Sequence, residues 1–395
     1  MSIWARTFTI LALLALLAGG RIVSFTACTL LGVYLAVRRA TRTALRRTTL
    51  TRQGASLRLF PGEEARLVVR LHNPTRIPLA WLAVTQELPG ELAAREPYRA
   101  ALSLPGRGSA TLSFPIEAKQ RGVYRVGALV LETGDPWGVE RFAVTAGEEA
   151  EVVVYPRVHP VESLGLPSSL VSGAFRAPRR SLADPSRVAG VRAFLPGDSI
   201  RHVHWRATAH TGELKVKTFE PVKYLDVVVL LDLVRAHYRS WNMTRLSELA
   251  IEVAASLAKA AADHRQSFGL YAAAREGAAP TALVRSGMGR GEAHLRRCLE
   301  ILAALRPAEE AFSLDRLVAR AMGEVSREAT LFVVTPHLEA EGRQAVARAL
   351  AAAYRVFVVE VREDEQRAEL PRGVGYARVA YGGDIARLGT WGELR

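Results

Sequence analysis

The stretch Asp226-Val227-Val228-Val229-Leu230-Leu231-Asp232 places five apolar residues between two aspartates. An uninterrupted apolar run of this length, ended by a polar residue, is typical of a strand buried on both faces of a parallel sheet. The residues that follow predict a helix with Thr244 as its N-cap, because threonine often caps helices. Its apolar residues recur at helical spacing on one face: Leu246, Leu249, Val253 and Leu257.

The alternation of strand and helix continues to the end of the chain. Further apolar strands are predicted at residues 268–274, 329–335, 354–361 and 376–381, with helices between them. Alternating elements of this length predict a doubly wound α/β domain over residues 226–395. Sheets of this kind bind ligands at the carboxyl ends of their strands, which is where Asp232 lies.

Asp232 stands where a von Willebrand A domain begins its metal site. Such a site supplies several oxygen ligands to a hard divalent cation, usually from the positions two and four residues further on. Those positions are Val234 and Ala236 here, and the strand ending at Thr335 continues without an aspartate. The sequence therefore predicts a von Willebrand A-like domain with a degenerate metal site. We expect Asp232 to cap a strand end, with no bound metal and no cofactor.

Residues 56–156 alternate apolar and polar side chains with a period of two, as in the apolar set Ala110, Leu112, Phe114 and Ile116. Pro-Gly pairs at residues 61–62, 89–90 and 105–106 punctuate this pattern. Short alternating strands with such turns predict an immunoglobulin-like β-sandwich. A sandwich of this kind is more often a spacer or a binding module than an enzyme.

The N-terminal region holds two apolar runs, residues 7–19 and 22–37, separated by Gly20-Arg21. One straight helix over both would be roughly 46 Å long, more than the ~30 Å hydrocarbon core of a bilayer. Two alternatives follow: a hairpin of two transmembrane helices over residues 1–40, or one tilted span. Arg21 favours the hairpin, because a charge in mid-membrane is costly. A cleaved signal peptide is a third interpretation, which the second apolar run disfavours.

A basic collar follows the second apolar run: Arg38, Arg39, Arg42, Arg46, Arg47 and Arg52. By the positive-inside rule the collar predicts that this side faces the cytoplasm. Residues 41–55 are expected to form a juxtamembrane linker, and the first five arginines to contact anionic lipid headgroups. The chain has 53 basic and 39 acidic residues and a net charge of +14, which favours anionic partners. It shows no nucleic-acid-binding motif, so we expect no nucleic acid partner.

Residues 157–225 form a linking segment that contains a long motif. The motif runs Gly190-Val-Arg-Ala-Phe-Leu-Pro-Gly-Asp-Ser-Ile-Arg-His-Val-His-Trp-Arg206. It resembles the signature of the family catalogued as domain of unknown function 58, which it matches at Arg192, Gly197, Asp198, Arg201 and Trp205. Thr208-Ala209-His210 departs from the family's Ser-Ala-Arg. Two upstream stretches resemble further elements of the family: Arg121-Gly122-Val123-Tyr124 and Asp135-Pro136-Trp137-Gly138-Val139.

The physical role of the motif has two interpretations. Pro196-Gly197-Asp198 predicts a turn, across which Asp198 could pair with Arg201 above a buried Trp205 ring. A brace that clamps the sandwich to the α/β domain is favoured, because a Gly-Asp turn with a buried Trp usually reflects packing. A polar docking surface is the alternative. His202, His204 and His210 do not predict zinc, because no further ligand beyond Asp198 is apparent and zinc needs three or four that converge.

The family resemblance also implies a partner and a function. Members of that family are commonly encoded beside AAA+ ATPases of the MoxR type and look like adaptors or co-chaperones for them. The resemblance implies a non-enzymatic, membrane-anchored scaffold of the inner (cytoplasmic) membrane, with its soluble domains in the cytoplasm. This scaffold would work with such an ATPase in the assembly or maturation of protein complexes. The alternative is a structural factor of cell-envelope assembly without an ATPase partner. No catalytic residue is predicted.

Overall fold

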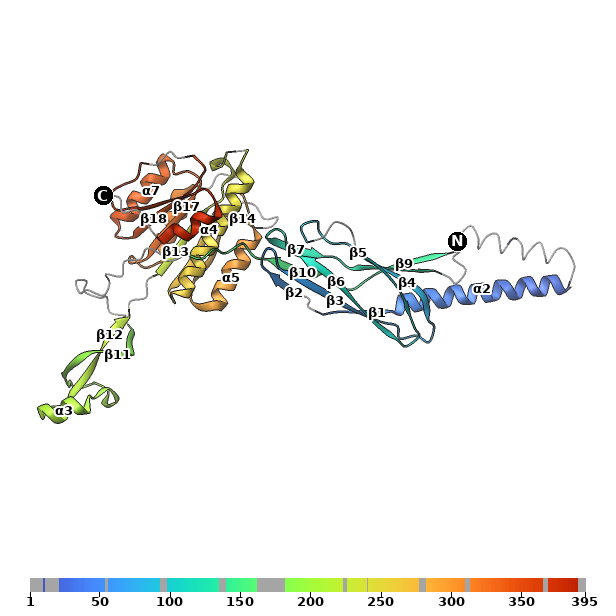
Figure 1. Cartoon of the computed structure of the whole chain (residues 1–395), viewed down its shortest axis with the longest axis horizontal. Coiled ribbons are helices and arrows are strands. Elements are labelled where there is room, and N and C mark those ends of the chain that lie inside the picture. Colours follow the sequence, from blue (N-terminus) through green and yellow to red (C-terminus); the bar gives the residue numbers. More distant parts are fainter. Residues whose placement is uncertain are drawn as a thin grey trace. The chain divides into compact units, whose positions relative to one another are not determined.

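The structure of the chain is a computed structural model (Figure 1). It describes residues 10, 21–53, 56–92, 98–134, 140–161, 182–222, 226–239, 241–276, 282–309, 313–364 and 369–389. The chain divides into two compact units. The first contains Met1–Arg157 with Leu299–Leu305, and the second contains Val158–Cys298 with Arg306–Arg395.

The first unit contains the long helix α2 (Arg21–Arg47). The expected transmembrane hairpin over residues 1–40 is wrong, because α2 continues without a break through the second apolar run and through the basic collar. Among the described residues, no helix is long and apolar enough to cross a membrane. The hairpin prediction treated the apolar run and the basic collar as separate segments, whereas both belong to the single helix α2. Residues 11–20, which include most of the expected first limb and its turn, lie outside the described residues.

The C-terminal part of α2 packs against protein. Ala44 and Leu45 are buried in the apolar core of the first unit, with Leu45 1% exposed. Arg38 Nε donates to Glu140 Oε2 at 2.5 Å, and this carboxylate is nearly inaccessible. Residues 41–55, expected as a linker, thus hold the end of α2 and the first strand of a sheet.

Three sheets surround the core of the first unit. One has the order β1 (Thr49–Gln53), β3 (Glu64–His72), β6 (Ser109–Glu117). The second has the order β2 (Ser56–Leu59), β10 (Ala150–Val154), β7 (Gly122–Val126). The third has the order β5 (Tyr98–Leu104), β4 (Leu79–Gln86), β8 (Leu129–Gly134), β9 (Arg141–Ala146). Alternate residues of the strands point into the core, as Leu67, Val69 and Leu71 do in β3, so the two-residue period places apolar side chains inside.

The second unit begins with a two-stranded arm, which we define as residues 182–222. Strands β11 (Leu182–Ala193) and β12 (Lys215–Val222) pair antiparallel, with Ala193 opposite Lys215. The residues between them, 194–214, form the arm tip. The tip contains the 3-10 helix η2 (Ile200–His202) and the short helix α3 (Trp205–Thr211).

The rest of the second unit is built on a sheet with the strand order β15-β14-β13-β17-β18-β19. These strands are β13 (Asp226–Asp232), β14 (Ser267–Glu276), β15 (Ala282–Gly289), β17 (Thr330–Thr335), β18 (Arg355–Val361) and β19 (Gly375–Val379). All neighbouring pairs are parallel except β14 with β15. β13 is central in the sheet and every residue after its first is buried, as the apolar run Val227–Leu231 requires.

The helices of this part are α4 (Met243–Asp263), α6 (Leu314–Glu324), α7 (Ala340–Ala351) and the first residues of α5 (Gly291–Ala304), with 3-10 helices η3 (Arg235–His237) and η4 (Gly382–Gly389). Residues 299–304 of α5 belong to the first unit. Val228 and Leu230 of β13 share one core with residues of α6 and α7. α4 packs against β13 and β14, and its four predicted apolar residues are all buried. Its N-cap is Asn242, so Thr244 lies inside the helix and does not cap it.

Replacing Leu45 by Ala tests whether α2 is part of the first unit's core. We expect Leu45→Ala to lower the free energy of unfolding of this unit by about 2–5 kcal/mol, because it removes a fully buried side chain. The neighbouring exposed Arg46→Ala should change it by no more than ~0.5 kcal/mol. Hydrogen exchange of the amides of β4 and β8, which contact α2, measures both effects. Equal exchange rates in the two variants would contradict the packing of α2.

Candidate functional site

The carboxyl edge of the α/β sheet holds a buried carboxylate, Asp232, which is 2% exposed. It ends β13, the central strand, because the apolar run of that strand stops there. Both carboxylate oxygens have partners. Oδ1 accepts from the Val234 backbone N–H at 3.1 Å, and Oδ2 lies 2.7 Å from His237 Nδ1 and 3.0 Å from Thr335 Oγ1.

The loop after β13 folds around this carboxylate. Tyr238 donates its hydroxyl to the backbone oxygen of Asp232 at 2.8 Å, and burial raises the pKa of this phenol well above its ordinary value. The hydrogen bond from His237 to Asp232 raises the pKa of the imidazole, against an opposing effect of burial. When His237 is protonated, its imidazolium faces the buried Asp232 carboxylate across this 2.7 Å contact.

These contacts leave the Asp232 carboxylate little capacity to bind a metal ion. The backbone N–H of Val234 donates to Asp232, and His237 and Thr335 occupy the other oxygen, so the carboxylate is already engaged in directions that a cation would need. Within the described part of the chain, no group of three or more His, Cys, Asp or Glu residues is arranged to hold a metal. The expected ligand positions two and four residues after Asp232 are Val234 and Ala236, which bring no side-chain oxygen.

A second buried carboxylate, Glu360, lies near the end of β18, opposite Thr335 of β17. The sequence did not predict it as a site residue. Its side chain is fully buried, Oε1 accepts from the Leu338 N–H at 3.1 Å, and Oε2 accepts from Tyr376 Oη at 3.0 Å and from Arg362 at 3.3 Å. Burial and the nearby Glu360 raise the pKa of Tyr376 to about 12. The available signal was an acid inside the apolar run of β18, because a buried acid needs donors around it.

Two cavities open beside this edge. One, of about 370 Å³, is lined by Asp232, His237, Arg316, His337 and Glu339 among others. The other, of about 550 Å³, is lined by His237, Arg239, Trp241, His337 and Arg362 among others. His237 and His337 line both cavities, so the two imidazoles are shared between them.

The motif at residues 190–206 lies in the arm, where Arg192 and Asp198 form a clamp. Arg192 Nη1 and Nη2 each donate to one oxygen of Asp198 at 2.6 Å, and the Leu195 N–H donates to Asp198 Oδ2 at 2.8 Å. Gly197 adopts φ 105°, a conformation that other residues rarely accept, which explains a glycine in this turn. The hydrogen bond from Arg192 lowers the pKa of Asp198 to about 2.

This geometry differs from what the sequence suggested. The partner of Asp198 is Arg192, and Arg201 lies exposed on η2 without contributing to the clamp. Trp205 is 65% exposed, so the expected burial of its ring beneath the turn is wrong. Trp205 is the first residue of α3, and the ring of the N-cap residue His204 accepts from the Ala207 N–H at 3.0 Å.

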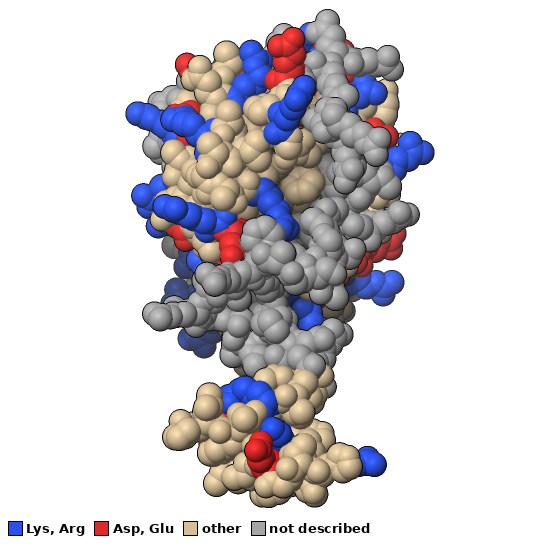
Figure 2. Space-filling model, turned by 90° about the vertical axis from the view of Figure 1, so that its left-hand side faces the viewer, with Lys and Arg blue, Asp and Glu red and all other residues tan. Residues whose placement is uncertain are grey.

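The arm tip therefore exposes large apolar side chains: Leu195, Ile200, Trp205 and Leu214. Ile200 is 70% exposed. On the face drawn in Figure 2 the arm is mostly uncharged surface with few charged side chains. His202, His204 and His210 form no metal cluster with other described residues, and His204 is used as a helix cap.

Residues 190–382 match the family model described as "Protein of unknown function DUF58". The match begins in β11 of the arm and ends at the start of η4, so the clamp and the carboxyl edge of the sheet both belong to the DUF58 region.

The chain is also similar to one curated relative and to parts of two solved structures. The chain is 23% identical over 192 residues to uncharacterized protein YeaD of Bacillus subtilis (strain 168), covering 48% of this chain and 48% of that protein. The chain thus spans about half the length of that curated relative. The CARDB domain of PF1109 from Pyrococcus furiosus is 19% identical over 27% of this chain and 94% of its own, with a TM-score of 0.21. Proximal thread matrix protein 1 from the mussel byssus is 10% identical over 42% of this chain and 46% of its own, with a TM-score of 0.32.

Three sequence features lie outside the DUF58 region: the stretch 121–124, the element 135–139 and the basic collar. Tyr124 donates its hydroxyl to the Gln120 oxygen at 2.9 Å, and the buried Arg121 donates to the backbone oxygens of Leu302 and Leu305, which belong to the same unit. The element at 135–139 lies outside the described residues.

Of the collar arginines, Arg38 pairs with Glu140 and four are exposed on α2: Arg39, Arg42, Arg46 and Arg47. Their contact with lipid headgroups stays a prediction.

The charge of His237 predicts a pH-dependent stability. Because its folded pKa is raised, its pairing with Asp232 stabilises the fold fully below the unfolded histidine pKa of about 6.5 and is lost as pH rises through the folded value. The difference in unfolding free energy between the parent protein and His237→Gln should therefore shrink as pH increases. Denaturant unfolding over a pH series measures this difference. The exposed His264→Gln serves as control and should show no such trend. A difference that grows with pH would rule out the ion pair.

The clamp in the arm predicts an unusual titration. Asp198 should titrate at about 2 in the folded chain, against an ordinary value of 3.8. Arg192→Gln should move the pKa back toward the ordinary value, because the guanidinium supplies the main stabilisation of the carboxylate. Arg201→Gln should leave it nearly unchanged. Carbon-detected NMR of the Asp198 carboxyl group measures its pKa in each variant. A larger change in this pKa for Arg201→Gln than for Arg192→Gln would contradict the pairing of Asp198 with Arg192.

Proposed function

We propose that this protein is a non-enzymatic adaptor that docks partner proteins through its arm tip, and that one partner is an AAA+ ATPase of the MoxR type. The docking role rests on one observation, the exposure of Trp205 and Ile200 on a clamped tip. The identity of the partner rests on the family resemblance of the signature motif.

The composition of the tip supports docking over a brace. Exposed apolar side chains grouped together mark interaction sites more often than isolated ones do. Tryptophan and arginine are also the residues that most often dominate binding energy at interfaces, and the tip offers Trp205 with Arg201 and Arg206. Because the Arg192–Asp198 clamp already orders the turn, less conformational entropy is lost when a partner binds.

The α/β part of the second unit has a supporting role in the proposal. We regard it as a von Willebrand A-like module that binds protein by surface shape, without a shared cation. The saturated Asp232 carboxylate favours this, since its oxygens accept from Val234, His237 and Thr335. The ligand in this view is a protein surface that meets the carboxyl edge of the sheet.

We also propose that the protein works on the cytoplasmic face of the inner membrane. The exposed arginines of α2 favour it, because basic side chains near an anionic surface contribute roughly 1 kcal/mol each. Co-sedimentation with anionic vesicles at rising salt would test this location without involving any protein partner.

Affinity capture of the tagged full chain from crosslinked cells, with mass spectrometry, tests the adaptor role. We expect recovery of a MoxR-type ATPase, and a loss of at least about tenfold for the double variant Ile200→Ser and Trp205→Ala, because hot-spot truncations cost this much or more. Val123→Ala, which truncates an exposed valine of β7, is the matched control and should leave recovery unchanged.

Two results would contradict the proposal. One is recovery of envelope-assembly proteins without an ATPase under every nucleotide condition, which would favour a structural factor. The other is equal ATPase recovery by the tip variant and by Val123→Ala, which would remove the arm tip from the interface.

A further inference from the structure

The arm tip carries two arginines that no described acid neutralises. The two acids of the tip are each paired with a cation that lies just outside it: Asp198 with Arg192 at 2.6 Å and Glu213 with Lys215 at 3.1 Å. The tip's own arginines are Arg201 and Arg206, which are both exposed, and within the described part of the chain neither forms an ion pair. The tip therefore presents positive charge beside its exposed apolar side chains.

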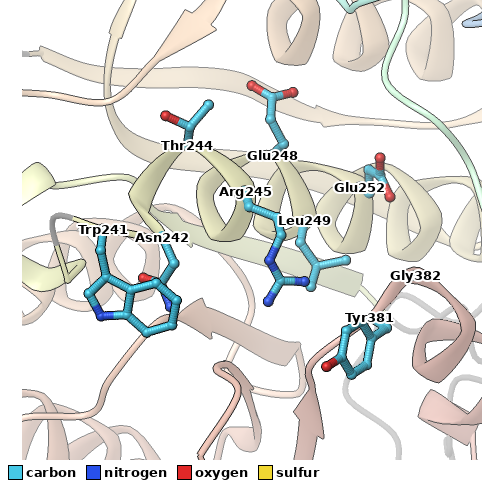
Figure 3. Close-up of a pocket in the computed structure, with 9 residues that line it drawn as sticks. All are labelled: Trp241, Asn242, Thr244, Arg245, Glu248, Leu249, Glu252, Tyr381 and Gly382. Carbon is cyan, nitrogen blue, oxygen red and sulfur yellow. The ribbon is translucent and has the colours of Figure 1, made fainter.

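The cavity beside α4 shows, by contrast, a surface whose charges are satisfied. It has a volume of about 510 Å³ and is lined by Trp241 and Tyr381, which are 70% and 65% exposed. Figure 3 shows Arg245 between these two rings, and this arginine is ion-paired and lies with its Cζ 5.3 Å from the Tyr381 ring centroid. Glu252 of the same cavity pairs with His159 at 2.9 Å. The space between the rings is thus filled, which leaves the arm tip as the surface with unmet charge.

The two elements of the tip are held on a common frame. Val203, which lies between η2 and α3, is 4% exposed and forms a bridge with Val216 of β12. The His204 N–H donates to the Lys215 oxygen at 2.8 Å. Residues 200–206 span at most roughly 20 Å even when fully extended. The apolar and basic side chains on either side of Val203 therefore belong to one small patch.

We refer to Ile200, Arg201, Trp205 and Arg206 as the tip patch. A partner that covers Trp205 also removes water from Arg206, the next residue, and from the nearby Arg201. A guanidinium that is desolvated without an opposite charge is costly, whereas a carboxylate can accept two parallel hydrogen bonds from it. The surface that covers the tip patch must therefore bring acids together with apolar groups.

We propose that the partner ATPase receives the arm tip in an apolar pocket bordered by carboxylates. Trp205 and Ile200 enter the pocket, and Arg201 and Arg206 each bind an acid at its rim. The inference rests on the adaptor role and adds the chemistry of the partner's surface. In this arrangement the two arginines determine specificity, because a neutral or basic apolar surface leaves both of them unpaired.

An anionic bilayer is the other surface that combines negative charge with an apolar interior. Glu213 argues against it, because its side chain is 74% exposed and it directly precedes the exposed Leu214. Entry of Leu214 into the bilayer would carry this carboxylate past anionic headgroups toward hydrocarbon, which is costly. A pocket on a protein can leave Glu213 in water, so the tip patch fits a protein better.

Charge variants of the tagged full chain test the proposal by affinity capture from crosslinked cells. Arg201→Glu with Arg206→Glu should lower recovery of the ATPase at least about tenfold, because both arginines then face acids of like charge. Arg201→Lys with Arg206→Lys should keep most of the recovery, because the positive charges remain. The matched control reverses two exposed arginines outside the arm, Arg296→Glu with Arg327→Glu, and should leave recovery unchanged.

Zero-length coupling then locates the acids. A carbodiimide activates a carboxyl group, and a lysine amine that touches it displaces the activated group to form an amide, with release of a urea. Arginine does not react, so Arg201→Lys and Arg206→Lys introduce the coupling sites. In lysed cells we expect mass spectrometry to find positions 201 and 206 joined to aspartate or glutamate residues of the ATPase that lie close together beside apolar residues. Arg296→Lys and Arg327→Lys are the controls and should give no such products.

Two results would overturn the acidic pocket and leave the adaptor role standing. One is full ATPase recovery by the charge-reversed tip. The other is full recovery by the lysine variants without coupling from position 201 or 206. Reduced co-sedimentation of the charge-reversed tip with vesicles of phosphatidylcholine and phosphatidylglycerol, at unchanged ATPase recovery, would assign the arginines to the membrane instead.

Failure of the adaptor role has a different signature. The parent chain then recovers no ATPase under any nucleotide condition. Coupling of positions 201 and 206 to neighbouring acids of another protein would in that case sustain the acidic pocket and replace only the identity of the partner.

Discussion

A buried carboxylate at the end of the central strand constrains the whole edge of the α/β sheet. Asp232 is nearly inaccessible, and an unpaired charge in such a place would cost several kcal/mol. The chain meets this requirement locally, with the Val234 N–H, the His237 ring and the Thr335 hydroxyl, and Glu360 is satisfied in the same manner beside it. Two of the donors to Asp232, Val234 and His237, lie in the loop after β13, and the third, Thr335, ends β17, so this carboxylate ties the loop to the neighbouring strand. The edge is thereby a preformed surface with two cavities and two imidazoles.

The arm follows the opposite principle. Two internal polar contacts order it, Arg192 with Asp198 and the His204 cap of α3, while large apolar side chains of its tip are exposed. An ordered turn with an exposed tryptophan is typical of a surface that binds another protein. The adaptor proposal names what covers it, a partner protein.

Local sequence pattern predicted the parts of the fold that local chemistry decides. The apolar run of β13 and the one-sided apolar face of α4 are properties of neighbouring residues, and both were found where expected. The missing oxygens at Val234 and Ala236 also follow directly from residue identity. The hairpin failed because hydropathy does not reveal that the apolar run and the collar share one helix, whose end packs at Leu45. Glu360 and the choice of Arg192 over Arg201 depend on which groups meet in three dimensions, and spacing along the chain does not determine that.

The most direct test of the docking arm is site-specific photocrosslinking from the tip. A photoreactive amino acid at position 200 or 205, introduced into the full chain in cells, reports which protein lies against the exposed tip. The docking arm predicts specific crosslinked products from both positions, to an ATPase, and few from position 123 on β7. Equal, weak crosslinking from positions 123, 200 and 205 would contradict it and leave the exposed tip without a partner.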